Sequence, residues 1–364
     1  MRYLKRILDC CIAAALLFSL CACGAQKKTT DVAFVTDIGD IYDNSFNGAI
    51  WEGVSAYASA NGISAQYYRP AERSTDAYYK AIKEAISDGA ETVVCHGDSF
   101  TAPVLKAAGR YDDVNFILTE SKEDDLPSNV TVINFSSLEA GFLAGYAVVA
   151  EGFTGLAFQG GDQSDETVNY CFGFIQGAEC AADDMMLDVM SIEMKINFKS
   201  DEETDDDVEA RALRWYTSGL QVIFACGDGV LMPVTKVSEM AGNRWVIAPD
   251  VDWFSTSETV ITCAEKAFAG SVCSALESIR SGVFAGGRAV TLGIADDGVL
   301  LNMNKSGFQT FKSPNYEALL AAVKNNPDFS ASLVSAEDAR TIILADADDI
   351  AALVSAEHLL IFTN

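Results

Sequence analysis

The chain has 364 residues, of which 49% are hydrophobic, so it can bury a substantial core and is long enough for two domains. Its formal net charge of −27 argues against nucleic-acid binding, because contact with phosphate needs clustered lysine and arginine. The sequence contains two histidines, His96 and His358, so neither a Ser-His-Asp triad nor a histidine-rich metal site is expected.

The first 23 residues are predicted to be an export signal. Three basic residues among the first six positions precede a mostly apolar run from Cys10 to Leu20, which is too short to cross a bilayer comfortably. The sequence LCACG at 20–24 resembles a bacterial lipobox, with a cysteine where Ala or Ser is usual. We therefore expect lipidation at Cys23 and a short tether at 24–30, with an ordinary signal peptide as the alternative.

The ten cysteines do not by themselves indicate a disulfide-rich protein. Four fall within the predicted signal, and the other six form no CxxC pair and lie mostly in apolar runs. We expect buried thiols rather than disulfides at these six positions, which behave as small hydrophobic residues. They are Cys95, Cys171, Cys180, Cys226, Cys263 and Cys273.

Predicted strands and helices alternate from residue 31 onward. Apolar runs typical of buried strands fall at 32–35, 91–95, 114–118, 130–134, 154–158, 220–225 and 245–249. Helical patterns fall at 45–60, 74–88, 101–110, 137–150, 166–182, 207–218 and 231–241. The second of these helices is well delimited, because Ser74 can cap its start and Gly89 can end it.

This alternation predicts an α/β fold with doubly wound parallel sheets. The strands are too many for one such sheet, so we expect two lobes. The N-terminal lobe would comprise 31–134 plus 258–288, and the C-terminal lobe 135–257 plus 289–364. Ligands of such sheets bind beyond the carboxyl ends of the strands.

Two other segments carry less information about function. The acidic run Asp201 to Glu209 is expected to be an exposed loop entering a helix, where acidic residues favour the helix N-terminus, and a metal site is the alternative. Residues 313–364 show helical stretches at 316–324 and 346–358, and they contain no chemical motif that we recognise.

Catalytic motifs are absent from the sequence. It contains no GxSxG, GxxxxGK, HExxH or strand-linked GxGxxG pattern. An enzyme that uses carboxylates alone stays an alternative, but acidic residues are so abundant that no pair stands out. We therefore predict a protein that is not an enzyme and that needs neither a cofactor nor a metal.

Loops at five predicted strand ends share one composition of carboxylates, small residues and aromatics. Carboxylates can accept hydrogen bonds from a sugar diol, glycine lets the backbone approach a ligand, and an aromatic ring can stack on a flat group. Helix capping explains any one loop, but five together favour a site for a small polar ligand. The loops contain Asp37 with Asp43 to Asn47, His96 to Phe100, Gly160 to Asp162, Gly227 to Gly229, and Asp250 to Trp253.

The segment VTDIGDIYDNSFNGAIWEG at 35–53 resembles the opening of the basic membrane protein family. It fits the family pattern at Asp37, Gly39, Asp43, Ser45, Phe46, Asn47, Trp51 and Gly53. Later segments are similar to further family motifs in the same order. They are YDDVNFIL, NFSSLEAGFLAGYAVV, GGDQSDETVNYCFGFIQGAE, and VIAPDVDW followed by VITCAEKA, so the resemblance spans about 31–300.

This resemblance implies the two-lobed fold of type I periplasmic binding proteins. Family members are substrate-binding lipoproteins of ABC transporters, and the best understood ones bind purine nucleosides. The implied partners are a nucleoside and the permease and ATPase subunits. The protein would be a monomer, held by its lipid on the extracytoplasmic face of the cell membrane.

Family positions carried over to this sequence imply particular roles. Phe46 and Tyr170 would sandwich the base, and Asn47 and Asp98 would hydrogen-bond its edge, while Asp37 would support the first loop. For Phe46 the alternative is packing onto its own helix, and for Tyr170 it is helix packing.

The ribose hydroxyls would be held by Gly227, Asp252 and Lys266, with a solvated helix position as the alternative for Lys266. Asp43, Ser45 and Asp228 complete the predicted site. Trp51 is expected to pack in the core or between the lobes rather than to contact ligand.

The sequence also departs from the family pattern. Acidic residues occupy 162–166, where Pro and apolar residues are common, Cys263 replaces a usual serine, and 227–229 lack the usual Gly-Gly-Thr-Gly. A sugar, another small polar solute, or a ligand with a positive charge or more hydroxyls therefore stays open. A surface sensor that feeds no transporter is a further alternative.

Overall fold

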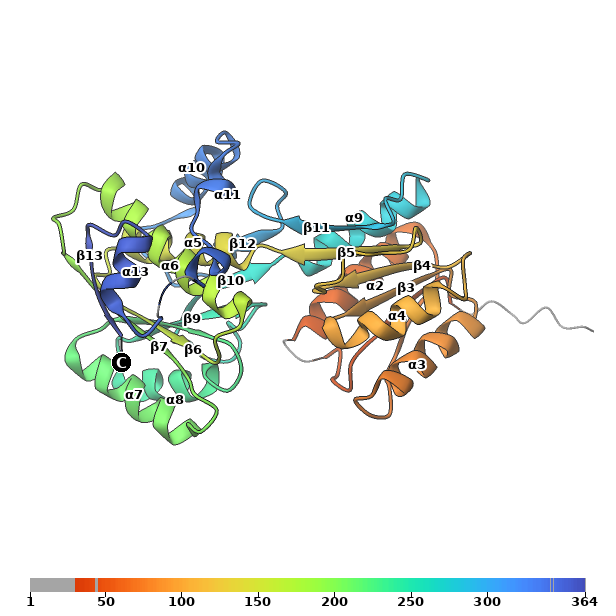
Figure 1. Ribbon diagram of the computed structural model, residues 1–364, viewed down its shortest axis with the longest axis horizontal. Coiled ribbons are helices and arrows are strands. Elements are labelled where there is room, and N and C mark those ends of the chain that lie inside the picture. The colour runs from red at the N-terminus through yellow and green to blue at the C-terminus, as the bar shows by residue number, and fades with distance from the viewer. Residues whose placement is uncertain (1–29, 43–44, 341, 343, 364) are drawn as a thin grey trace, which may run out of the picture.

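The computed structural model describes residues 30–42, 45–340, 342 and 344–363. The predicted signal with Cys23, most of the tether, and Asp43 lie outside the described residues. The described chain forms two α/β lobes that lie side by side and are joined by a few strands and short segments (Figure 1). The predicted fold class is therefore confirmed.

The first lobe is built on a six-stranded sheet in which every neighbouring pair is parallel. Its strands, in spatial order, are β11 (Arg288–Leu292), β5 (Val130–Phe135), β4 (Asn115–Thr119), β3 (Thr92–His96), β1 (Val32–Val35) and β2 (Ala65–Tyr68). Its helices are α2 (Phe46–Asn61), α3 (Thr75–Ser87), the 3-10 turn η1 (Asp98–Phe100), α4 (Thr101–Ala108) and α9 (Phe268–Arg280).

The second lobe contains a seven-stranded sheet, parallel except for its edge strand β12. Its strands, in spatial order, are β12 (Val299–Leu301), β10 (Val260–Lys266), β9 (Trp245–Asp250), β8 (Val222–Cys226), β6 (Gly155–Gly160), β7 (Ile192–Phe198) and β13 (Leu359–Thr363). Its longer helices are α5 (Ser137–Glu151), α6 (Asp165–Asp184), α7 (Asp205–Ser218), α8 (Leu231–Ala241) and α10 (Ser313–Lys324). The short C-terminal helices are α11 (Phe329–Ser332), α12 (Ala336–Ala339) and α13 (Ala347–Leu353).

The strand pairing corrects the predicted lobe boundaries. The predicted N-terminal lobe included 258–288, but β10 pairs with β9 and β12 in the second sheet. The predicted C-terminal lobe began again at 289, but β11 pairs with β5 in the first sheet. The chain therefore changes lobe at Ser136, at Ala267 and over 293–298.

Both faces of each sheet are covered by helices because the strands are apolar on both sides. Along β1, Phe34 packs in one buried cluster with residues of α2 and α9, whereas Val35 packs in another with residues of α3 and α4. In the second lobe, Phe158 of β6 faces α5 and α6, whereas Ala157 faces α7 and α8. The cluster that contains Phe34 and Phe158 runs through both lobes.

Helices α5 and α6 approach each other unusually closely, and four glycines make this possible. A Cβ atom on Gly141 or Gly145 of α5 would lie 2.3 or 2.0 Å from a carbonyl oxygen of α6. A Cβ atom on Gly173 or Gly177 of α6 would lie 1.9 or 2.0 Å from a carbonyl oxygen of α5. Since real Cβ atoms cannot come so near, any larger residue would push the two helices apart.

The three crossover segments are hydrogen-bonded to one another. The Ser136 amide donates to the Leu292 carbonyl at 2.9 Å, and the Ala267 amide donates to the Gly298 carbonyl at 2.8 Å. The buried carboxylate of Glu139 accepts from the Ile294 amide at 2.7 Å. These bonds hold the crossovers together as one connection between the lobes.

The C-terminal segment from α11 to β13 packs on the second lobe and adds an edge strand to its sheet. Polar side chains of α6 form hydrogen bonds with the backbone of this segment. Asn169 accepts from the Ala336 amide at 2.7 Å, Gln176 bonds both backbone groups of Val334, and Glu179 accepts from the His358 amide and ring. The described residues after 313, which show no motif, therefore complete the second lobe.

Several local predictions are confirmed. Ser74 caps α3 by accepting from the Ala77 amide at 3.2 Å, and the acidic run enters α7 with Thr204 in a capping box. All six cysteines of the described chain are free thiols, four buried and two half-buried. No helix in the described ranges is long and apolar enough to cross a membrane.

The glycine contact predicts a large difference between two glycine-to-alanine variants. Gly145→Ala forces its Cβ against α6 and should lower the free energy of unfolding by about 1–3 kcal/mol. Gly270→Ala in α9 is the matched control, because no atom lies within 4 Å of its added Cβ, and it should be neutral or slightly stabilising. Urea unfolding monitored by circular dichroism measures both; equal effects would show that the α5–α6 contact tolerates a methyl group.

Candidate ligand-binding cleft

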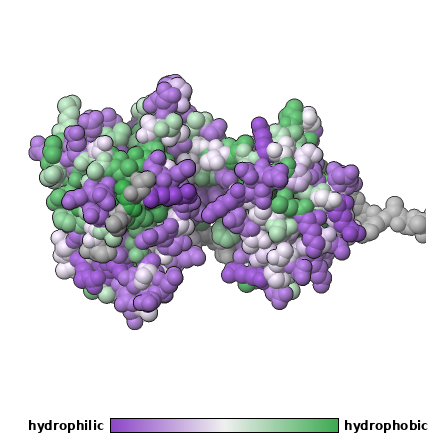
Figure 2. Space-filling view, in the orientation of Figure 1, coloured by the Kyte–Doolittle hydropathy of each residue, from purple (hydrophilic) through white to green (hydrophobic). Residues whose placement is uncertain are grey.

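A cavity of about 440 Å³ lies between the lobes, where the carboxyl ends of strands from both sheets meet. The space-filling view shows the two lobes separated by a cleft with hydrophilic residues on both rims (Figure 2). The volume falls in the usual range for small-molecule sites. The lining residues are Phe46, His96, Gly97, Asp98, Glu120, Ser121, Lys122, Asn134, Ser137, Glu166, Asn169, Asp250, Lys266 and Phe268.

The first lobe contributes an aromatic wall to this cavity. Phe46, the first residue of α2, stacks on His96 at the end of β3 with ring centroids 4.1 Å apart. Phe268 meets the His96 ring edge-on at 5.4 Å. Burial and the nearby Lys266 lower the pKa of His96 to about 3, so the imidazole is neutral at physiological pH. This wall offers a flat apolar surface on which a ring can stack.

Asn47 and Asp37 lie behind the aromatic wall. Asp37 Oδ1 accepts from the Gly39 amide at 2.6 Å and from Asn47 Nδ2 at 2.8 Å, while its other oxygen pairs with Arg73 at 3.3 Å. Asn47 is only 2% exposed and does not line the cavity. The structure therefore does not place Asn47 at a base edge, although Asp37 does hold the first loop together as expected.

The second lobe contributes a buried ammonium surrounded by carboxylates. Lys266, the last residue of β10, places Nζ 2.9 Å from Asp250 Oδ1 and 3.2 Å from Glu120 Oε1, and it also pairs with Glu166. Burial alone would lower the pKa of Lys266, but Asp250 and its other acidic neighbours raise it above its ordinary value. Lys266 therefore stays charged and joins Glu120 of the first lobe to the second lobe.

Two of these carboxylates sit on backbone in the left-handed region. Glu120 follows β4 with φ 58°, and Asp250 ends β9 with φ 68°. Such values are uncommon for residues other than glycine and cost of the order of 1–3 kcal/mol each. The strain is offset by the ion pairs, and it aims both carboxylates at the same ammonium.

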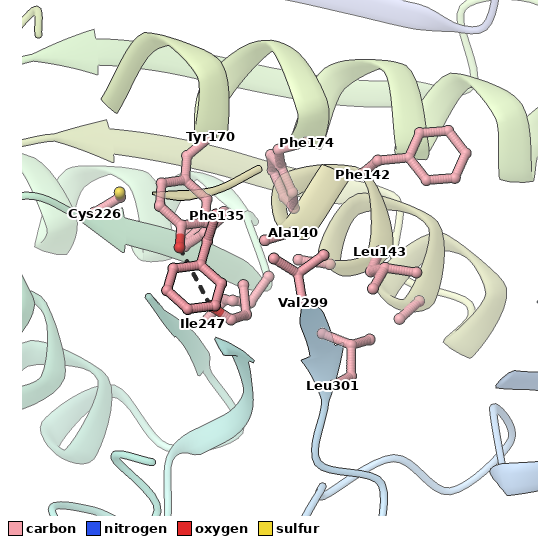
Figure 3. Close-up of a cluster of buried hydrophobic side chains, with 14 of the residues drawn as sticks. Phe135, Ala140, Phe142, Leu143, Tyr170, Phe174, Cys226, Ile247, Val299 and Leu301 are labelled. Carbon is pink, nitrogen blue, oxygen red and sulfur yellow. Dashed lines mark hydrogen bonds between the residues drawn. The ribbon is translucent and has the colours of Figure 1, made fainter. Parts of the chain in front are cut away.

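Tyr170 was expected to stack on the ligand, but it is fully buried beneath the cavity. Figure 3 shows Tyr170 within the buried cluster beside Phe135. The Tyr170 ring packs edge-on against Phe224, and its hydroxyl donates to Asp250 Oδ1 at 2.9 Å. Tyr170 does not line the cavity. The structure therefore does not place Tyr170 where it could sandwich a base, because it faces the core; Asn169, its neighbour on α6, lines the cavity instead.

Two predicted ribose contacts, Asp252 and Gly227, and the further predicted site residue Asp228 also lie outside the cavity lining. Asp252 pairs with Lys305 on the surface and accepts from the Phe254 amide at 3.0 Å. The backbone of Gly227, which has φ 99°, lies so close to Gly161 that an added Cβ atom would be 3.0 Å from the Gly161 amide nitrogen. Asp228 beside it is exposed. The end of β9 thus presents Asp250 to the cleft, whereas Asp252 in the following loop does not line it.

Of the other predicted positions, Asp98 lines the cavity and Ser45 does not. Asp98 lies in η1 and accepts from the Lys122 amide at 3.0 Å. Ser45 is the N-cap residue that precedes α2, and its carbonyl accepts from the Ala49 amide at 3.1 Å. Trp51 packs edge-on against Tyr67 away from the cleft, as predicted. No group of three acidic, His or Cys side chains in the described chain is arranged to hold a metal ion.

The sequence did not reveal several lining residues. Glu120 and Asn134 come from strands β4 and β5, whose ends carry no glycine-rich loop, and Phe268 follows a crossover. A usable signal did exist for Glu120, since it lies two residues after the predicted strand at 114–118. Ser137 and Glu166 stand in the first turns of α5 and α6, where they read as ordinary helix starts.

Two α/β lobes, three crossovers and a ligand-sized cleft between them are the architecture of type I periplasmic binding proteins. The description "ABC transporter substrate-binding protein PnrA-like" belongs to the family that matches residues 30–325, and the chain is a member of that family. It is the basic membrane protein family suggested by the sequence. The chain is thus an ABC transporter substrate-binding protein, a class of binding proteins rather than of enzymes.

Relatives and solved structures agree with this membership. The chain is 27% identical to the "ABC transporter nucleoside-binding protein BmpA" of Lactococcus lactis subsp. cremoris, over 78% of this chain and 84% of the relative. It is 22% identical to "Basic membrane protein A" of Borreliella burgdorferi, over 80% and 86%. A solute-binding protein from Conexibacter woesei superposes with a TM-score of 0.68 at 20% identity, covering 83% of this chain and 97% of that structure.

The environment of Glu120 predicts a pH-dependent stability. Burial raises the pKa of Glu120 from 4.5 to about 7, with Lys266 opposing the rise. Its stabilising contribution is therefore complete below pH 4.5 and is lost as the pH rises through 7. Because the lowered pKa of His96 acts in the opposite direction, the quantity to measure is the difference from a variant.

The free energy of unfolding of Glu120→Gln minus that of the wild type should rise by up to about 3 kcal/mol as the pH goes from 4.5 to 8, because only the wild type carries the titrating carboxyl. Urea unfolding across this range measures the difference. The exposed Glu317→Gln on α10 serves as control and should show a flat difference. A flat difference for Glu120→Gln as well would mean that its carboxyl is solvated in the folded protein.

Proposed function

We propose that this protein is an exported, lipid-anchored binding protein that captures a purine nucleoside in the cleft and delivers it to an ABC permease and its ATPase. The observation that carries the proposal is a ligand-sized cavity with an aromatic wall in one lobe and hydrogen-bonding charges in the other. The printed name of the Lactococcus relative, a nucleoside-binding protein, supports the same ligand class. The predicted lipobox supports the anchor on the extracytoplasmic face.

In this proposal the base stacks on Phe46, which is backed by His96. Stacking of this kind contributes roughly 1–3 kcal/mol per base. Asp98 lies at the same wall and can accept from an exocyclic amine of the base. The ribose hydroxyls would donate to Asp250, and Lys266 would donate to them in turn.

Closure of the lobes around the ligand is expected from the connection between them. The two lobes are joined through three crossover segments, at Ser136, Ala267 and 293–298, and rotation about these segments would narrow the cleft. Lys266 immediately precedes one crossover and bonds Glu120 across the cleft. A ligand that engages both residues would bind the closed state more tightly than the open one.

The nucleoside proposal predicts the outcome of a ligand panel. Inosine, guanosine or adenosine should raise the melting temperature of the full-length chain in detergent, by an amount that grows with concentration. Free ribose and hexoses at the same concentrations should not. A response to sugars alone would favour the alternative of a sugar-binding protein. If the protein responds to nucleosides but serves no ABC transporter, it would be a sensor.

Two aspartates test which carboxylate holds the ribose. Asp250→Asn should weaken nucleoside binding about 10- to 100-fold, because hydrogen bonds to a charged acceptor contribute about 1.5–3 kcal/mol. Asp252→Asn should leave the affinity within about twofold, since Asp252 pairs with Lys305 outside the cavity. Isothermal titration calorimetry measures both, and the reverse ranking would show that Asp252 enters the cleft when the lobes close.

A further inference from the structure

The charges that line the cleft are unbalanced. Four lining carboxylates face two ammonium groups, and His96 is neutral. Of the two ammonium groups, Lys122 is exposed, whereas the side chain of Lys266 is only 3% exposed. The sequence as a whole is also strongly acidic, with a net charge of −27, so the field around the cleft favours cations.

The imbalance is sharpest around Lys266. Its single positive charge is shared by Asp250, Glu120 and Glu166, so this group of four keeps an excess of negative charge. Carboxylates held together in a partly desolvated site cost free energy unless a cation compensates them. The raised pKa of Glu120 is consistent with that cost.

The three carboxylates are not equivalent in their accessibility to a ligand. Asp250 already accepts from the Tyr170 hydroxyl and from Lys266. Glu120 projects from the opposite lobe and its side chain is 23% exposed. The Glu166 side chain is 50% exposed at the start of α6, where it lines the cavity. Glu166 is therefore the carboxylate best placed to meet a charged group on an entering ligand.

We propose that the cleft prefers a nucleoside that carries a positively charged amino group on its sugar, and that Glu166 is the residue that sets this preference. This inference rests on the proposed nucleoside function. If the base stacks on the aromatic wall, the sugar lies beside Lys266 and its three carboxylate partners. An ammonium there binds Glu166 and Glu120 and neutralises part of the excess charge, whereas a hydroxyl satisfies hydrogen bonds and leaves the charge unchanged.

Ligands matched except for one charge provide the test. Adenosine is compared with 5′-amino-5′-deoxyadenosine and 3′-amino-3′-deoxyadenosine, by calorimetry on the full-length chain in detergent at pH 7, where an aliphatic amine is largely protonated. At least one amino analogue should bind at least about ten times more tightly than adenosine. Raising the salt concentration should reduce this ratio, because ions screen the partly exposed carboxylate.

One variant and a matched control test whether Glu166 sets the preference. Glu166→Gln should reduce the ratio of analogue to adenosine affinity severalfold. The control, Glu277→Gln on α9, removes a carboxylate of similar exposure, 48%, that pairs with Arg280 away from the cavity, and it should leave the ratio unchanged. Using the ratio removes any general change in affinity that follows from freeing Lys266.

The outcomes separate this inference from the function on which it rests. Binding of adenosine that equals or exceeds that of both amino analogues would overturn the charge preference and leave the nucleoside function standing. No binding of any of the three would overturn both. A preference that survives in Glu166→Gln would remove Glu166 as the residue responsible.

Discussion

The contact between α5 and α6 is the constraint on which the second lobe and half of the cleft depend. Four glycines let the backbones of the two helices touch, so the helices are fixed in register as well as in distance. Both helices begin at the cleft, α5 with Ser137 and α6 with Glu166 in its first turn. The register of the pair therefore decides where these polar side chains meet the cavity. A larger side chain at any of the four positions would move them.

Lys266 links this scaffold to the other lobe. It ends β10, precedes a crossover, and binds carboxylates from three different elements, one of them in the first lobe. Tyr170 connects the group to the core, because its ring is buried against Phe224 while its hydroxyl holds Asp250. The position of the cleft charges is thus determined by the hydrophobic core beneath them. A ligand that rearranges this group acts directly on the connection between the lobes.

The C-terminal segment is tied into the same framework although it follows the family match, which ends at residue 325. Its backbone is held by side chains of α6, and Asn169, which lines the cavity, is one of them. Ser330 donates to Glu139, whose other oxygen holds the third crossover. The segment therefore supports the hinge and one wall of the cleft, and it also covers the outer face of α6.

The sequence alone determined the fold class and the family, and it pointed to a few residues of the candidate cleft. Apolar strand runs, helix caps and the motif at 35–53 depend on neighbours in the chain, so they can be read without coordinates. Phe46, Asp98 and Lys266, which the family motifs point to, all line the same cavity.

Only the tertiary structure decided the lobe boundaries and which side chains face the ligand. The exchange of β10 and β11 between sheets depends on pairing between strands far apart in sequence. Tyr170 and Asn169 are adjacent on α6, and only the packing of that helix turns Tyr170 into the core and Asn169 to the cleft. At the end of β9, the left-handed backbone at Asp250 aims that carboxylate at Lys266, and Asp252 in the following loop pairs with Lys305. Such orientations are set by packing and backbone geometry, which local residue patterns do not encode.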